Sequence, residues 1–194
     1  MLSLVLSLAL AAQEPAGPAA VAQDPGAALS EAASSGTVDD IRRLLASGAP
    51  IDRRDRDGLT PLMIAVSDGR ADIVRLLIES GASVNAADRR RASVAMYAAP
   101  SDRAEILRLL IERGADVNTR SVEGMTPVLV AAFGGNDASL RVLIASHADL
   151  GVRDYEQRTV LMAAAQSGSK AAVETVLATG PDVEAVDQDG VTAL

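Results

Sequence analysis

Cysteine is absent from this chain of 194 residues, and histidine occurs only once. The absence of cysteine excludes disulfide bonds, thiolate metal ligands and cysteine nucleophiles. Structural zinc sites are built mainly from cysteine and histidine, so we expect no zinc site either. The sequence therefore predicts neither a bound metal nor a cofactor.

Aromatic residues are also scarce, since the chain holds one Phe, two Tyr and no Trp. Hydrophobic residues still make up 48% of the chain and charged residues 23%, which is ordinary for a folded protein. Small aliphatic side chains suit closely packed helices better than a β-sandwich, which favours aromatic and β-branched residues. The composition therefore favours an all-α fold, and the length favours one domain.

Positive charge is in the minority, because 18 basic residues face 26 acidic ones and the net charge is −8. Such a chain repels nucleic acid and anionic membranes unless its basic residues are clustered. We therefore expect no nucleic-acid partner.

The first dozen residues form a short apolar run, MLSLVLSLAL followed by two alanines. The run is too short for the ~20 residues of a membrane-spanning helix, and Ala9-Leu10-Ala11 fits a signal-peptidase site. We expect residues 1–12 to be a signal peptide and residues 13–26, with three prolines, to be an extended linker. The mature chain would then have no integral membrane segment. Because no Lys or Arg precedes the run, a buried N-terminal helix or a misassigned start codon is the alternative.

The rest of the chain repeats with a period of 33 residues and no insertion. Its clearest column holds hydroxyl residues, namely Thr60, Ser93, Thr126, Thr159 and Thr192. A second column holds Gly48, Gly81, Gly114, His147 and Gly180. We divide residues 27–194 into a degenerate first unit at 27–57, four units at 58–90, 91–123, 124–156 and 157–189, and the start of another at 190–194.

Each unit predicts two helices and a turn-rich finger. In Thr60-Pro61 the hydroxyl can cap a helix and the proline suits its first position, so we expect helices at about 61–67 and 71–80. Gly81 then suits the left-handed residue that ends a helix. Neither helix can bury its apolar side alone, so neighbouring units must stack.

These residues carry a resemblance to a known family. The segment Asp57-Gly58-Leu59-Thr60-Pro61-Leu62-Met63-Ile64-Ala65 resembles the D-G-x-T-P-L-H-x-A signature of ankyrin repeats. The resemblance implies an all-α ankyrin-repeat solenoid of stacked antiparallel helix pairs with β-turn or hairpin fingers.

Some units depart from the pattern. The signature histidine is replaced throughout, by Met63, Met96, Leu129 and Met162. The unit 91–123 lacks the Thr-Pro start and holds Pro100, so we expect it to be the least regular. The unit 27–57 should serve as the N-terminal cap, and the unit that opens at Gly190 suggests that the chain is a fragment.

Two features imitate reactive sites. Residues 52–58 and 187–190 contain the D-x-D-G of calcium loops, but the first acidic ligand and the distal Glu are missing, so we interpret both as Asp-Gly turns. His147 stands in the glycine column, where a loop residue with left-handed backbone is expected rather than a base. The sequence has no phosphate loop, nucleophile elbow or zinc-protease motif, and we expect no catalytic residues and no enzyme.

The resemblance implies that partners bind to the finger tips and to the concave ends of the first helices. These positions are Arg56, Asp57, Leu59, Ser67, Asp68, Arg89, Arg90, Pro100, Ser101, Val122, Glu123, Met125, Phe133, Tyr155, Glu156, Arg158 and Gln166.

Aromatic and charged residues mark this surface further. Phe133 and Tyr155 fall on it and are candidate anchors, with core packing as the alternative for Phe133, whereas Tyr97 falls in a core column. Arginines concentrate at 53–56 and 89–91, while residues 121–194 hold 10 acidic and 4 basic residues. This segregation would orient a partner, or else form an ordinary solvated face.

We therefore expect a monomeric, non-catalytic protein–protein interaction module whose partner has an acidic and an apolar part. A single lysine among the basic residues and frequent alanine suggest a bacterial protein, exported to the periplasm or secreted. Three alternatives stay open: a binding appendage of a larger enzyme or effector, an assembly or stability factor for an exported enzyme, and an enzyme in its own right.

Overall fold

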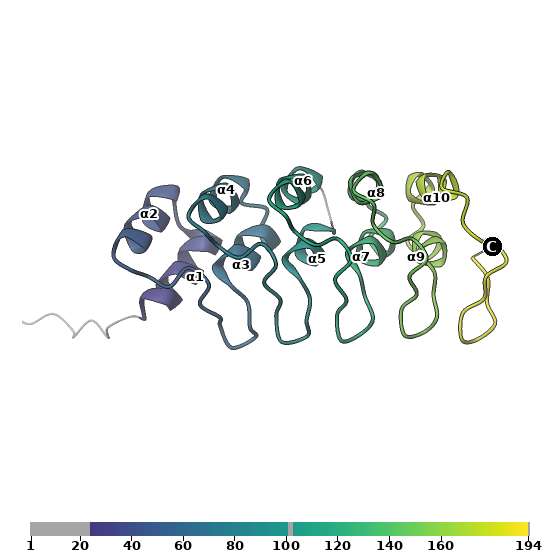
Figure 1. The fold of residues 1–194 in the computed structure, drawn as a ribbon, viewed down its shortest axis with the longest axis horizontal. Coiled ribbons are helices and arrows are strands. Elements are labelled where there is room, and N and C mark those ends of the chain that lie inside the picture. The colour runs from purple at the N-terminus through teal and green to yellow at the C-terminus, as the bar shows by residue number, and fades with distance from the viewer. Residues whose placement is uncertain (1–23, 101–102, 194) are drawn as a thin grey trace, which may run out of the picture.

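The computed structural model describes residues 24–100 and 103–193 (Figure 1). The expected signal peptide, most of the expected linker, and the residues Ser101 and Leu194 lie outside this part. Within it the chain forms ten α-helices: α1 Pro25–Ser35, α2 Val38–Ala46, α3 Pro61–Ser67, α4 Ala71–Glu79, α5 Val94–Ala98, α6 Ala104–Glu112, α7 Pro127–Phe133, α8 Asp137–Ala145, α9 Val160–Gln166 and α10 Lys170–Leu177.

The helices form two parallel rows (Figure 1). The odd-numbered helices make the first-helix row, which lies beside the projecting fingers, and the even-numbered helices make the second-helix row. Each first helix packs against its own second helix and against the first helices of neighbouring units. The expected all-α repeat solenoid is confirmed.

Local capping explains where the first helices begin. The hydroxyl of Thr60 accepts a hydrogen bond from the Met63 N–H at 3.3 Å, and Thr159 does the same for Met162 at 3.2 Å. Pro61 stands at the first helical position as expected. Helix α1 begins at Pro25, where the Asp24 carboxylate caps it by accepting a bond from the Gly26 N–H at 2.9 Å.

The unit 91–123 has the least regular first helix, as predicted. Helix α5 has 5 residues, whereas α3, α7 and α9 have 7 each. Ser93 makes no side-chain capping bond, and Pro100 lies just beyond the helix end.

The core consists of aliphatic side chains from both rows. Its largest fully buried members are leucines and isoleucines together with Met63, which occupies the signature histidine column. Leu129 is also fully buried in that column. His147 has φ 59° and ends α8 in the left-handed conformation that Gly81 and Gly114 use after α4 and α6, which confirms its loop role.

Candidate functional site

The fingers are the segments 55–59, 88–92, 121–125, 154–158 and 187–191, and one turn closes them all. In the first finger the Asp55 carboxylate accepts bonds from the N–H groups of Asp57 and Leu59 at 2.9 and 2.8 Å. Asp88, Asp154 and Asp187 repeat this pair of bonds, and Ser121 makes it with its hydroxyl.

These turns confirm the Asp-Gly interpretation of the two calcium-like segments. Gly58 and Gly190 follow the aspartates with φ 87° and 77°, and Asp55 and Asp187 bind their own backbone. Within residues 24–100 and 103–193 there is no group of three or more His, Asp or Glu side chains that could hold a metal ion.

Neighbouring fingers are joined to one another. The backbone N–H groups of Arg89, Val122 and Gln188 donate to carbonyls of the preceding finger at 2.8–3.2 Å. The side chains of Arg54, Arg120 and Arg153 reach forward to the carbonyl 33 residues later, with Arg153 bonding Val186 O at 2.8 Å. The fingers therefore form one fixed row.

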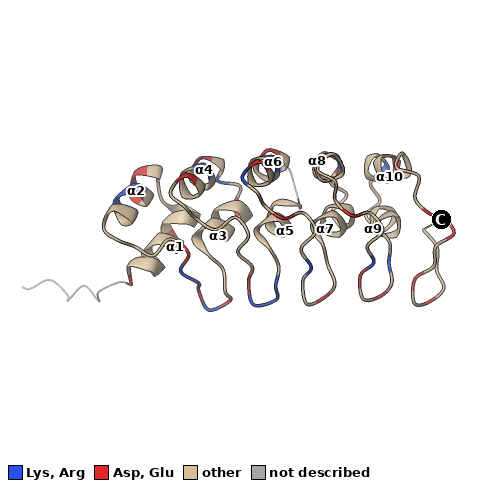
Figure 2. Ribbon diagram, in the orientation of Figure 1, with Lys and Arg blue, Asp and Glu red and all other residues tan. Residues whose placement is uncertain are grey.

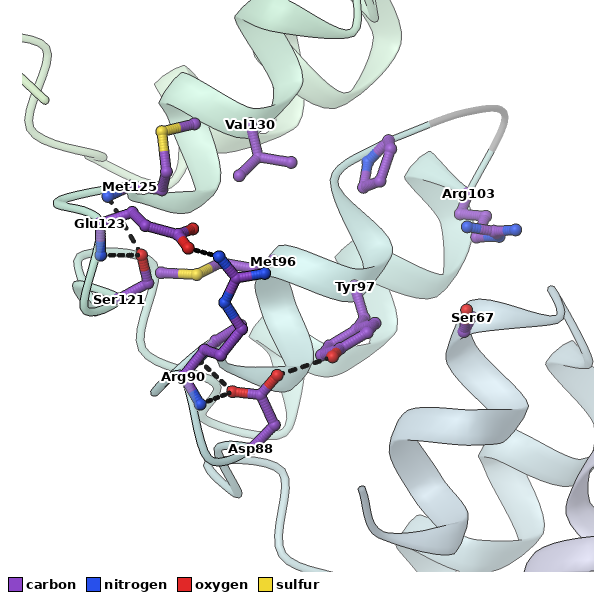
Figure 3. A pocket seen from close by; sticks show the side chains of 12 residues that line it. Ser67, Asp88, Arg90, Met96, Tyr97, Arg103, Ser121, Glu123, Met125 and Val130 are labelled. Carbon is purple, nitrogen blue, oxygen red and sulfur yellow. Dashed lines mark hydrogen bonds and ion pairs between the residues drawn. The ribbon is translucent and has the colours of Figure 1, made fainter. Parts of the chain in front are cut away.

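A hollow of about 310 Å³ opens between α5 and α7 on the finger side (Figure 3). It is lined by Ser67, Asp88, Arg90, Ala92, Met96, Tyr97, Pro100, Arg103, Ser121, Glu123, Met125 and Val130. Five of the predicted binding residues line it: Ser67, Arg90, Pro100, Glu123 and Met125.

The prediction that Tyr97 is a core residue is wrong. Its ring packs against the core, but the side chain is half-buried and lines the hollow, where its hydroxyl donates to the Asp88 carboxylate at 2.8 Å (Figure 3). Burial, reinforced by the bond to Asp88, raises the pKa of Tyr97 to about 12. The hydroxyl therefore remains a neutral donor at physiological pH.

Phe133 is neither a free anchor nor a fully buried core residue. It packs half-buried against the core, and the Arg158 guanidinium lies 4.7 Å from its ring centroid. Arg158 also pairs with Asp154, which is 2% exposed, at 2.7 Å and with Glu156 at 2.8 Å. This network engages Arg158 and Phe133 within the protein.

Tyr155 is the most exposed aromatic residue among those described. Its side chain is 64% exposed, and Arg120 lies 5.7 Å from its ring centroid. The ring rests on the preceding finger, since a Cβ added to Gly124 would lie 2.9 Å from Tyr155 Cδ1. Val122, at the equivalent position of that finger, is 46% exposed. The two side chains give the row an apolar tip.

The expected basic patch is smaller than its sequence suggests. Arg53 pairs with Asp24, Arg54 bonds backbone carbonyls, and Arg90 pairs with Glu123. In the described part of the chain, the side chains of Arg56, Arg89 and Arg91 are exposed and have no such partner. Figure 2 shows these positive fingers, and it shows no charge on α3, α5, α7 or α9.

The other predicted binding residues differ in exposure. Asp57, Asp68 and Gln166 are exposed, and Leu59 is half-buried. Asp68 accepts a bond from the Ser34 hydroxyl at 2.6 Å, which links the first two units. Sequence reasoning missed Asp88, Met96, Arg103, Ser121 and Val130 at the hollow, because their columns belong to turns and helix faces in the other units. The short α5 and Pro100 were the available signals.

Comparisons with known proteins agree with this architecture. A family model described as ankyrin repeats (3 copies) matches residues 29–121 and 95–187. A search of curated proteins found no match. In the described ranges, none of the helices has both the length and the apolar character needed to cross a membrane.

Proposed function

The chain belongs to the ankyrin-repeat family, and from this premise we propose that it is a non-catalytic module that binds a partner protein along its fingers and first-helix row. Ankyrin repeats are generally protein–protein interaction modules, which supports this proposal. The partner, the binding residues and the lack of catalysis are parts of the proposal.

The fixed row of fingers is the observation that carries this proposal. Each described finger is closed by its own turn, and all four junctions between fingers are bridged by backbone bonds, by arginines or by both. A surface that is ordered before binding loses less conformational entropy when a partner arrives. Such a row can contact one partner across several units.

Exposed groups on the row indicate the partner's chemistry. Tyr155 and Val122 offer an apolar tip, and exposed tyrosines are frequent anchors at interfaces. Arg56, Arg89 and Arg91 offer positive charge that no carboxylate of the described chain neutralises. We therefore propose a partner segment with an apolar and an acidic part.

We also propose that the protein is exported, on the basis of the apolar run at residues 1–12. The mass of the chain recovered from cell fractions tests this proposal. Cleavage after Ala11 or Ala12 in an extracytoplasmic fraction would support it, and an uncleaved chain in the cytoplasm would contradict it.

Cross-linked affinity capture from a native extract tests the binding function. One bait is the wild-type chain, and a second carries Arg56→Glu with Arg89→Glu on the fingers. A matched control carries Arg75→Glu with Arg113→Glu, which makes the same charge change on exposed positions of the second-helix row.

We expect one protein to be captured by the wild-type and control baits and lost from the finger variant. Equal capture by all three would show that the finger arginines are not part of the surface. No capture by any bait, although circular dichroism shows each to be helical, would contradict the interaction function itself.

A further inference from the structure

We propose that the hollow between α5 and α7 receives one apolar side chain from an acidic segment of the partner protein. This inference rests on the proposed function and specifies where and how recognition occurs. At about 310 Å³ the hollow stands at the lower end of ligand-pocket volumes, ~300–1,000 Å³, which suits a side chain and its peptide backbone.

The lining of the hollow supports an apolar occupant. Ala92, Met96, Met125 and Val130 line it together with the ring of Tyr97. Methionine side chains are unbranched and polarisable, so Met96 and Met125 can adapt to the shape of an inserted group. Burying an aliphatic or aromatic side chain there removes apolar surface of both partners from water.

The hollow arises from two substitutions within the repeat. One unit further along, the positions of Pro100 and Met125 are held by Phe133 and Arg158, and the guanidinium lies over the phenyl ring. Arg158 is fixed there by Asp154, whereas the corresponding finger has Ser121, which cannot pair with a guanidinium in that way. The junction between α7 and α9 is thus filled from within, and the junction between α5 and α7 is open.

The hydrogen-bonding groups at the hollow favour an acidic segment. Glu123 pairs with Arg90, and the oxygens of Asp88 already accept bonds from the Tyr97 hydroxyl and from the N–H groups of its own turn. Arg103 also lines the hollow, and its guanidinium has no partner within residues 24–100 and 103–193. Ser121 uses its oxygen to accept two backbone bonds, which leaves its own proton available to a ligand. A carboxylate beside the inserted side chain would meet these donors.

A random peptide library displayed on phage provides the probe. We would select it on the full chain and measure the Kd of the enriched peptide by calorimetry. The expected peptides carry an apolar residue next to Asp or Glu. Enriched peptides without acidic residues would overturn the proposal, and so would the absence of any enrichment.

A closed-junction variant then locates the binding site. Pro100→Phe with Ser121→Asp and Met125→Arg installs the residues found at Phe133, Asp154 and Arg158, so the finger should keep its fold. We expect this variant to bind the peptide about tenfold more weakly or worse. Arg103→Gln should weaken binding several-fold and reduce its salt dependence, whereas Arg113→Gln should change neither. Unchanged affinity in the closed-junction variant would overturn the proposal.

The two proposals fail in different ways. A partner that the finger variant loses but the closed-junction variant captures as well as wild type would refute the role of the hollow and leave the interaction function intact. A peptide that binds in the hollow, with no protein captured by any bait, would refute the interaction function and, with it, recognition of a protein partner at the hollow, and would leave only a peptide-sized binding site.

Discussion

The side-chain oxygen of Asn118 accepts a hydrogen bond from the backbone N–H of Asp149 in the following unit at 2.8 Å. The same link joins the two preceding pairs of units, through Asp52 to the Ser83 N–H at 3.0 Å and through Asn85 to the Asp116 N–H at 2.8 Å. At the next junction the column holds Gly151, which has no side chain to reach Asp182. This ladder of side-chain hydrogen bonds between neighbouring units therefore ends one junction before the last one.

Gly151→Asn should restore the ladder and stabilise the protein. Gly151 does not need a left-handed backbone, and an added Cβ would meet only the Asp149 carboxylate, at 3.3 Å. A new hydrogen bond contributes about 1 kcal/mol, and replacing glycine adds a few tenths by restricting the unfolded chain. Urea unfolding should show the gain in the free energy of unfolding.

Gly151→Ala separates the two contributions. It restricts the unfolded chain but cannot reach Asp182, so it should give less than half of the gain of Gly151→Asn. Equal gains from both variants would show that the hydrogen bond does not form.

Ser139→Ala should also stabilise the protein. The Ser139 hydroxyl is fully buried in α8 and has no hydrogen-bond partner among the described residues, in a column that holds Ile73 and Ile106. Removing a buried, unsatisfied hydroxyl relieves a desolvation cost of about 1 kcal/mol or more. Thermal unfolding should show a higher Tm. Ser169→Ala is the matched control, and it should lower the Tm because Ser169 caps α10.

Tyr97 should ionise only at strongly alkaline pH. In a Tyr155→Phe background it is the sole tyrosine, and tyrosinate absorption should show its pKa at about 12. This pKa lies above that of a tyrosine in the unfolded chain, about 10. The neutral Tyr97 hydroxyl therefore stabilises the folded protein fully below pH 10, and this contribution is lost as the pH rises to 12.

Asp88→Asn should lower the pKa of Tyr97 while leaving it above 10, because burial contributes most to the shift. The asparagine oxygen can still accept the two backbone bonds of the finger turn. Asp187→Asn makes the same change in a finger without a tyrosine and should leave the titration unchanged. An unshifted midpoint in Asp88→Asn would contradict the role of this carboxylate.

Features that depend on a few neighbouring residues could be predicted from the sequence. The Thr-Pro pairs, the glycine column and the period of 33 predicted the helix starts, the helix ends and the stacking, because capping and left-handed residues act within one turn of chain. His147 was placed correctly for the same reason.

Features that depend on contacts between units could not be predicted in this way. Tyr97 shares its column with Ile64, Val130 and Ala163, so the pattern predicted core, but Tyr97 alone in this column carries a hydroxyl, which bonds Asp88 of the preceding unit. The engagement of Arg158 by Phe133 and Asp154 likewise depends on side chains brought together from two different units.

Asp137 should contribute stability that is lost in acid. Its carboxylate accepts bonds from Arg141, at 2.9 Å, and from the buried Thr175 hydroxyl of α10, and these bonds hold its pKa below the ordinary 3.8. The contribution is present above the unfolded pKa and disappears as the pH falls through the folded pKa. Asp137→Ala should cost about 1–2 kcal/mol at neutral pH, since it leaves Thr175 unpaired.

Urea unfolding at neutral pH and again below the folded pKa tests this contribution. The difference in the free energy of unfolding between wild type and Asp137→Ala should be smaller in acid than at neutral pH. Arg141→Ala removes only an exposed partner and should cost less than half as much at neutral pH. A difference between wild type and Asp137→Ala that is independent of pH would contradict the assignment.

Asp154 and Arg158 should show strong energetic coupling. Arg158→Met alone leaves a carboxylate that is 2% exposed without its cation, and breaking a buried pair in this way costs about 3 kcal/mol. Asp154→Ser alone should cost less, because Arg158 keeps its contact with Glu156. The hydroxyl of the serine introduced at position 154 can also close the turn, as the hydroxyl of Ser121 does in the preceding finger. The double variant Asp154→Ser/Arg158→Met reproduces the pair Ser121 and Met125 of the preceding finger, so most of the loss should be recovered. A double-mutant cycle from urea unfolding should therefore give a coupling free energy of about 2 kcal/mol.

Additive losses would mean that the ion pair is not what stabilises this finger, and that the packing of Arg158 on Phe133 is the dominant contact.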